Sequence, residues 1–207
     1  MIALENAKKR KRRRQKRSLR FTPTAWAKLL FLRDLGPTEV GGFGISDPDD
    51  LLLVTDFALI QQTATPITVE LDDDSVADHF DQFIDEGYAP EQVGRIWIHT
   101  HPGDCPRPSE TDEQTFTRCF GEADWAAMFI LARGGATYTR LRFNTGPGCD
   151  VSLKCSVEFD NEFASSDQLT WTAEYDQCVN KIEPFILRSP NEKEIDERWL
   201  ASEWVAS

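Results

Sequence analysis

The sequence predicts an α/β fold in which helices sandwich a mixed β-sheet. Segments with the apolar spacing of helices alternate along the chain with short, strongly apolar segments of strand length. The 207 residues include 40% hydrophobic and 11% aromatic residues, which is enough for one well-buried domain. No apolar run approaches the roughly 18 residues that a membrane-spanning helix needs. We therefore expect no association with a membrane.

The first half of the chain contains signals for two helices and three strands. Thr22 or Thr24 caps the first helix, which a Gly-Pro pair stops. Asp74 or Ser75 caps the second helix, on whose polar flank His79 is expected at the surface. The predicted helices span residues 25–35 and 75–87, and the predicted strands span residues 38–46, 51–61 and 67–71.

The second half continues the alternation. A Gly-Gly pair predicts a hairpin turn between two strands, and in the second of these Leu141 and Phe143 alternate with Arg140 and Arg142. A Gly-Pro-Gly turn then precedes an alternating segment that is typical of an edge strand. The predicted strands span residues 94–99, 125–132, 138–144 and 151–159, and the predicted helices span residues 109–120 and 168–185.

One short stretch carries the residues suited to chemistry. His99 and His101 end an apolar strand, and residues two apart in a strand point to the same face. Ser109 follows a proline and precedes a helical pattern, so it is the expected N-cap, with Asp112 in the first turn. Each half alone is common, since Ser-x-x-Asp is an ordinary capping box. Together they place two imidazoles and one carboxylate where they can bind a catalytic zinc ion with an open fourth position.

This stretch resembles the motif of the JAMM (MPN-plus, JAB-type) zinc metallopeptidases. The motif consists of His-x-His-Pro, a seven-residue spacing and Ser-x-x-Asp. In this chain it is matched by His99 and His101 with the following proline, by the seven residues between His101 and Ser109, and by Ser109 and Asp112. The family also places a glutamate followed by glycines on an early strand, and the segment Glu39-Val-Gly-Gly is similar to that element. The resemblance covers about residues 24–145 and implies a cytidine-deaminase-like JAB/MPN fold.

The resemblance also implies a role for each matching residue. His99, His101 and Asp112 are expected to hold one catalytic Zn²⁺. Glu39 is expected to act as general base and then as general acid, and Ser109 to stabilise the oxyanion of the tetrahedral intermediate. Two further acidic residues, Glu70 and Glu86, are alternative candidates for the general base because of their location in the chain. Neither of them lies in a Glu-x-Gly context. Cys105 lies in the loop between the two halves of the motif, where an oxidation-sensitive gate, an inhibitory thiolate and a bystander all stay open.

The activity implied is zinc-dependent hydrolysis of the bond after the C-terminus of a ubiquitin-like protein, either in a conjugate or in a precursor. The compact core is similar to that of bacterial JAMM proteins that accompany ubiquitin-like modifier systems. The expected partners are therefore a ubiquitin-like protein or its conjugate, together with E1-like and E2-like pathway proteins. Two alternatives stay open: release of an amino acid from a ubiquitin-fold sulfur-carrier protein, and a non-catalytic MPN scaffold.

Charge divides the chain unevenly. Residues 1–20 carry ten Lys or Arg residues against Glu5 alone, and the remaining residues hold 13 basic and 34 acidic side chains. We expect residues 1–20 to be a disordered basic tail. It is either solvated or folded back onto the acidic body of the chain, or else it serves as a localisation signal or contacts nucleic acid or an acidic partner. Residues 21–188 are expected to form the JAB/MPN domain and residues 189–207 an acidic amphipathic helix. Five cysteines without paired spacing, and no apolar segment of a secretory signal, favour the cytoplasm.

Overall fold

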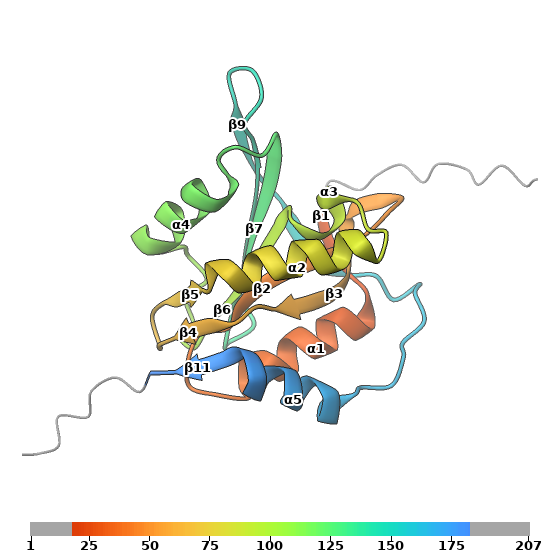
Figure 1. The fold of residues 1–207 in the computed structure, drawn as a ribbon, viewed down its shortest axis with the longest axis vertical. Helices are drawn as coiled ribbons and strands as arrows, with labels where there is room; N and C mark the ends of the chain where they lie inside the picture. Colours follow the sequence, from red (N-terminus) through yellow and green to blue (C-terminus); the bar gives the residue numbers. More distant parts are fainter. Residues whose placement is uncertain (1–17, 183–207) are drawn as a thin grey trace, which may run out of the picture.

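The computed structural model describes residues 18–182, which form two β-sheets and the helices that cover them (Figure 1). The helices are α1 (Pro23–Asp34), α2 (Asp73–Asp85), α3 (Pro90–Val93), α4 (Glu110–Phe120) and α5 (Gln168–Cys178). The strands are β1 (Ser18–Phe21), β2 (Gly41–Asp47), β3 (Asp50–Leu59), β4 (Gln62–Ala64), β5 (Val69–Leu71), β6 (Ile96–His101), β7 (Trp125–Ala132), β8 (Thr137–Phe143), β9 (Cys149–Ser152), β10 (Lys154–Val157) and β11 (Val179–Lys181).

The larger sheet has eight strands in the order β10-β1-β3-β2-β6-β7-β8-β9. Strand β6 pairs antiparallel with β2 and parallel with β7, so it lies well inside the sheet. Strands β9 and β10 stand at opposite ends of this order although only Leu153 separates them in the chain, so the sheet curls until its two edges approach. The smaller sheet has the order β11-β4-β5. The predicted mixed α/β fold is confirmed.

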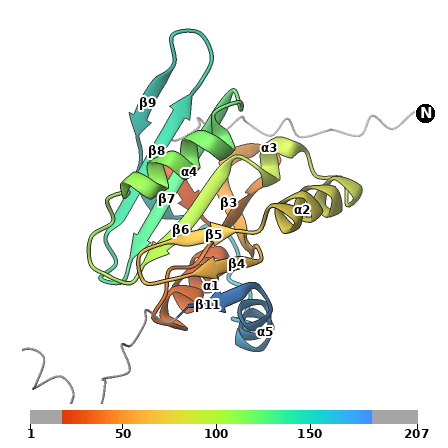
Figure 2. The same ribbon diagram turned by 60° about the vertical axis from the view of Figure 1, so that its left-hand side comes forward.

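Two hydrophobic cores lie on the two faces of the large sheet. One core packs α1 and α5 against the sheet, and the other packs α2 and α4, with α4 lying across β6, β7 and β8 in Figure 2. Strand β7 serves both, because Phe129 belongs to the first core while Met128 and Ile130 belong to the second. In β6 the same alternation places Ile98 in the first core and Trp97 in the second. His99 and His101 therefore share the face that α4 covers.

Local signals explain several of the element boundaries. The Thr22 Oγ1 atom accepts a hydrogen bond from the Ala25 amide (3.3 Å), and a proline follows the cap, so Thr22 rather than Thr24 starts α1. The cap of α2 is Asp72, whose Oδ1 accepts from the Ser75 amide (2.9 Å), and the prediction of Asp74 or Ser75 is wrong. Among residues 18–182, no helix is both long and apolar enough to cross a membrane.

The expected boundary of the basic tail at residue 20 is wrong in its last three residues. Ser18–Phe21 form β1, which pairs in parallel with β10 on one side and β3 on the other. Leu19 is completely buried, and the buried guanidinium of Arg20 contacts Asp50 (2.6 Å) and Glu158 (2.9 Å). The charge of Arg20 thus belongs to the folded domain. Residues 1–17 and the predicted helix over residues 189–207 lie outside the described part of the chain.

Three other expectations need correction. His79 is buried, with 7% of its surface exposed, because its ring stacks on Phe43 and its Nε2 lies 3.2 Å from the Val93 carbonyl oxygen. The predicted single strand over residues 151–159 is two strands, β9 and β10, on opposite edges of the sheet. The predicted helix over residues 168–185 ends at Cys178, after which Val179–Lys181 pair with β4 as β11.

Candidate active site and metal centre

Two elements bring the predicted metal ligands together. His99 and His101 lie at the end of β6, where His99 is fully buried and His101 is partly exposed. Asp112 lies in the first turn of α4 and is 4% exposed. The His99 Nε2 atom is 3.4 Å from Asp112 Oδ1, and the His101 Nε2 atom is 3.6 Å from Asp112 Oδ2. One donor atom from each of the three residues lies within 4.8 Å of the others.

These separations suit the corners of a zinc tetrahedron. Ligands that each lie 2.0–2.1 Å from a tetrahedral zinc ion are about 3.4 Å from one another, and each histidine lies at close to this distance from one oxygen of Asp112, His99 from Oδ1 and His101 from Oδ2. The Nε2 atoms of His99 and His101 are also buried without a hydrogen-bond partner. Buried polar atoms are normally satisfied, so these two nitrogens are suited to bind a cation. The donor set fits zinc.

The pKa shifts of His99 and Asp112 favour metal binding, and that of His101 opposes it. Burial lowers the pKa of His99 below its ordinary value and so keeps the imidazole neutral. Burial would also lower the pKa of His101, but the contacts with Asp112, the Cys105 carbonyl and Glu39 outweigh it and raise the value. For Asp112 burial acts to raise the pKa, yet the contacts with both histidines and with the Ser109 amide hold it far below its usual range. Asp112 is therefore a carboxylate at any ordinary pH.

Each histidine ring is oriented by a different contact. The His101 Nδ1 atom lies 2.8 Å from the Cys105 carbonyl oxygen, which can only accept, so in the neutral ring Nδ1 carries the proton and Nε2 keeps its lone pair. Trp97 stacks on His99 with ring centroids 4.4 Å apart, and His99 Nδ1 has no hydrogen-bond partner. The side chain of Cys105 is a free, exposed thiol. The contact of Cys105 with the site is thus made by its backbone carbonyl.

Ser109 and Asp112 form a reciprocal capping box. The Ser109 Oγ atom accepts from the Asp112 amide (3.1 Å) and donates to Asp112 Oδ2 (2.8 Å), and the Ser109 amide donates to the same oxygen (2.7 Å). The N-cap prediction is confirmed. The hydroxyl proton of Ser109 is engaged with Asp112, so the oxyanion role stays a prediction that requires this O–H to turn toward the substrate.

Glu39 lies just before β2 and faces the metal ligands. It is 4% exposed, its Oε1 atom is 3.7 Å from His101 Nε2, and its Oε2 atom is buried without a hydrogen-bond partner. Burial, only partly offset by His101 and reinforced by Asp112, raises the pKa of Glu39 to about 7. A carboxyl group with such a pKa can both take up and release a proton near neutral pH.

The two competing glutamates have other surroundings. Glu86 is exposed at the C-terminal end of α2 and accepts a hydrogen bond from Gln82 (3.0 Å). Glu70 lies on β5, paired with Thr63, with its side chain exposed. Neither side chain joins the cluster of His99, His101 and Asp112, so Glu39 is the acidic residue that the fold brings to it.

Sequence reasoning missed two residues that support the site. Gln62 is 3% exposed and clamps the strand after Glu39, because its Oε1 accepts from the Gly41 amide and its Nε2 donates to the Gly41 carbonyl, both at 2.8 Å. Trp97, which stacks on His99, was expected only as a strand residue. The period-2 alternation that places Trp97 on the face of His99 was the one available signal, and nothing local marks Gln62.

An apolar groove runs beside the metal centre between α2, α4 and β5. It has a volume of about 330 Å³, and its walls include Phe43, Val69, Phe80 and Phe120. Trp97 lines the groove and also stacks on His99, so the groove and the site share a side chain. Charged groups stand at the same walls, namely Glu70, Asp73 and Arg118.

Comparison with known proteins adds little to this geometry. No model of a known protein family matches the chain, and no curated protein matches it. Among solved structures, the chain is similar to a JAB1/MPN domain protein from Archaeoglobus fulgidus at 14% sequence identity, with a TM-score of 0.36, over 68% of this chain and 99% of that one. A similarity of this extent identifies neither a family nor an activity.

Proposed function

We propose that the protein is a zinc-dependent peptidase of the JAMM type, with a cytidine-deaminase-like JAB/MPN domain. The observation that carries the proposal is the approach of His99, His101 and Asp112 to one point, with Glu39 facing them from the segment just before β2. Three protein ligands leave the fourth position of a tetrahedral ion for substrate or water, as catalytic zinc sites require. When bound, zinc supplies Lewis acidity, which acidifies a water molecule and polarises the carbonyl group of the substrate.

The residues of the chain supply the proton transfers. Glu39 accepts the proton of the attacking water and delivers it to the leaving amine, for which a pKa of about 7 is well placed. Asp112 stays ionised and holds His99 and His101 in register. Ser109 stabilises the developing oxyanion once its hydroxyl turns from Asp112. Ser109→Ala should then lower kcat, not KM, because the contact forms only in the transition state, with a loss of roughly 10²–10³ in rate typical for such donors.

The surroundings of the site favour an extended peptide as substrate. Backbone hydrogen bonds join β4 and β5 just beyond both ends of their pairing: the Asp72 amide donates to the Gln61 carbonyl, and the Thr65 amide donates to the Thr68 carbonyl. In an antiparallel pair, every second residue between these two bonds directs its backbone groups toward the other strand. By this alternation the backbone groups of Val69 and Leu71 point away from β4, toward the edge of the three-stranded sheet. That edge borders the apolar groove. An extended chain could thus pair with β5 and place its side chains in the groove.

We further propose that this extended chain is the C-terminal tail of a ubiquitin-like protein, in a conjugate or a precursor. The resemblance of the motif supports this, as does the combination of an apolar groove with the carboxylates of Glu70 and Asp73, which suits a tail of apolar and basic residues. E1-like and E2-like proteins are the partners that such a substrate implies. All five cysteines are free thiols, which supports a reducing compartment such as the cytoplasm.

A substrate panel tests the proposal. Zinc-loaded protein would be incubated with ubiquitin-like precursors, with their lysine conjugates and with a sulfur-carrier protein that bears a C-terminal amino acid. Glu39→Gln and a chelator-treated sample serve as controls. Cleavage after the C-terminal tail of the ubiquitin-like protein, lost in both controls, supports the proposal. Cleavage of the sulfur-carrier substrate alone favours a peptidase that releases an amino acid from a sulfur-carrier protein. Zinc binding without any cleavage favours a non-catalytic scaffold.

A further inference from the structure

Helix α4 rests on the sheet through few buried side chains. Asp112, Phe116 and Phe120 are its buried residues, and Asp112 belongs to the metal centre. The two histidines belong to the sheet itself, because His99 pairs with Gly41 of β2 and with Ile130 of β7. The distance between Asp112 and the histidines therefore depends on how α4 is held on the sheet.

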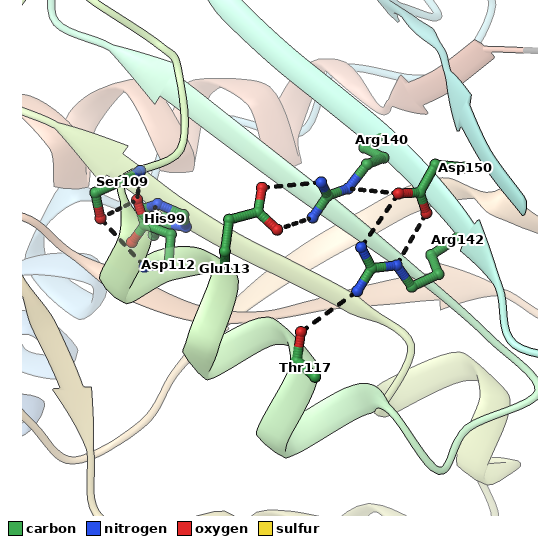
Figure 3. A network of polar contacts seen from close by, with 8 residues as sticks. All are labelled: His99, Ser109, Asp112, Glu113, Thr117, Arg140, Arg142 and Asp150. Carbon is green, nitrogen blue, oxygen red and sulfur yellow. Dashed lines mark hydrogen bonds and ion pairs between the residues drawn. The ribbon is translucent and has the colours of Figure 1, made fainter.

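A bidentate ion pair holds the first turn of α4 on a neighbouring strand (Figure 3). Arg140 of β8 donates from Nη1 to Glu113 Oε1 (2.9 Å) and from Nη2 to Glu113 Oε2 (2.7 Å). The guanidinium carbon also lies 5.3 Å from the centre of the Phe116 ring. The Arg140 side chain is only 12% exposed, against 38% for Glu113. Two parallel hydrogen bonds fix orientation as well as distance.

The sheet connects this pair to the histidines. Trp97, Met128 and Arg140 are direct neighbours across β6, β7 and β8. His99 and Ile130 are paired two residues further along these strands, on the same face of the sheet. Consecutive residues of a helix point about 100° apart. Asp112 thus points toward β6 while Glu113 points toward β8, as Figure 3 shows. Together the two side chains oppose rotation of α4 about its own axis over Phe116.

We propose that Arg140 is a positioning residue of the metal centre: by binding Glu113, it sets where Asp112 stands opposite His99 and His101. The inference rests on the proposed function in that it takes these three residues to be metal ligands. Without the ion pair, α4 can roll on Phe116, and the carboxylate of Asp112 then leaves the position at which the three donors meet. Residues behind the direct ligands typically change metal affinity by about 10- to 100-fold when they are replaced.

Arg142 offers a matched control on the same strand. Its guanidinium carbon lies 5.2 Å from the same Phe116 ring, and its main partner is Asp150 of the neighbouring β9 (2.9 and 3.1 Å). Its hydrogen bond to α4 is a single long one, to Thr117 Oγ1 at 3.5 Å. Arg142→Gln thus removes a guanidinium group from the same face of the sheet and from the same Phe116 ring. It leaves the ion pair between Arg140 and Glu113 intact.

The test measures metal binding and not turnover alone. Full-length wild type, Glu113→Gln, Arg140→Gln, the double variant and Arg142→Gln would be stripped with a chelator and titrated with Zn²⁺ against a competing chelator. The visible spectrum of each Co²⁺-loaded protein reports ligand geometry. We expect both single variants to bind Zn²⁺ about 10- to 100-fold more weakly, with an altered Co²⁺ spectrum. The double variant should bind Zn²⁺ no more weakly than the weaker single variant, because each of the three variants lacks the same ion pair. Arg142→Gln should resemble the wild type.

The melting temperature of the metal-free proteins separates positioning from general packing. Glu113 is 38% exposed, and Asp150 stays 3.9 Å from Arg140 when Glu113 is replaced, so metal-free Glu113→Gln should melt close to the wild type. Unchanged Zn²⁺ affinity in Arg140→Gln, additive losses in the double variant, or an equal loss in Arg142→Gln would each overturn the inference. A wild-type protein that binds no metal would refute the proposed function itself, and the inference with it.

Discussion

Truncation at two neighbouring positions tests the placement of β1. Removing residues 1–17 takes away nine of the ten Lys and Arg residues found in residues 1–20 but leaves β1, whereas removing residues 1–20 also takes Ser18, Leu19 and Arg20. These three residues pair in register with Lys154, Cys155 and Ser156 of β10. The two truncations therefore differ by one strand of the sheet and by little else.

The structure allows the difference to be estimated. Leu19 has no exposed surface, and deleting a buried leucine side chain costs about 2–5 kcal/mol. Arg20 and Glu158 are each 4% exposed in their side chains, and removing one partner of such a buried pair costs about 3–5 kcal/mol. The sum, at least about 5 kcal/mol, approaches the whole stability of many domains. For a domain of this size it corresponds to a fall of roughly 10–20 °C in melting temperature.

Thermal and urea unfolding of the full chain and the two truncated forms would check this estimate. We expect removal of residues 1–17 to leave the midpoint nearly unchanged, because a segment this charged has little apolar surface to bury. Removal of residues 1–20 should lower the midpoint strongly or prevent folding. A Leu19→Ala variant of the full chain gives an independent reading. If both truncated forms unfolded together with the full chain, β1 would not be part of the folded sheet.

Three further predictions concern the site and its neighbourhood. His101→Ala should lose zinc, as elemental analysis would show, because three ligands leave no redundancy. Glu39→Gln should keep zinc and lose turnover, and in the wild type kcat/KM should fall below about pH 7 as Glu39 becomes protonated, with a midpoint lowered further by the bound cation. Burial lowers the pKa of His79 beneath the 6.5 of the unfolded chain, so stability should fall as pH drops below about 6.5. Unfolding titrations should show less of this fall in His79→Gln.

The sequence alone predicted the elements whose signals are local. The cap at Ser109 and the spacing of His99 and His101 depend on residues that are neighbours in the chain, and the structure keeps both. The strand over residues 125–132 was predicted to the residue, since it is one apolar run with polar neighbours. The convergence of the metal ligands followed from these pieces, because a strand end and the next helix start are a short loop apart.

Long-range partners explain what was missed. Arg20 appeared to belong to a basic tail, because its partners Asp50 and Glu158 lie 30 and 138 residues away. His79 falls on the polar flank of its helix, and only the position of Phe43 in the folded sheet shows that this flank is covered. The arginines of β8 alternate with apolar residues as on a solvent-facing strand. In the fold α4 covers them, so their charges pair with the helix instead of with water.

The metal ligand on α4 has a structural role that its histidine partners lack. Asp112 accepts two hydrogen bonds from Ser109 in the capping box while it faces both imidazoles. Replacing it removes a ligand and also frees the first turn of α4, a loss of about 1 kcal/mol for a typical cap. Zinc loss in Asp112→Ala is then ambiguous, since a frayed helix and a missing donor give the same result. His101→Ala removes a donor and the contact with the Cys105 carbonyl but leaves the capping box untouched, so zinc loss in this variant does not come from a freed helix start.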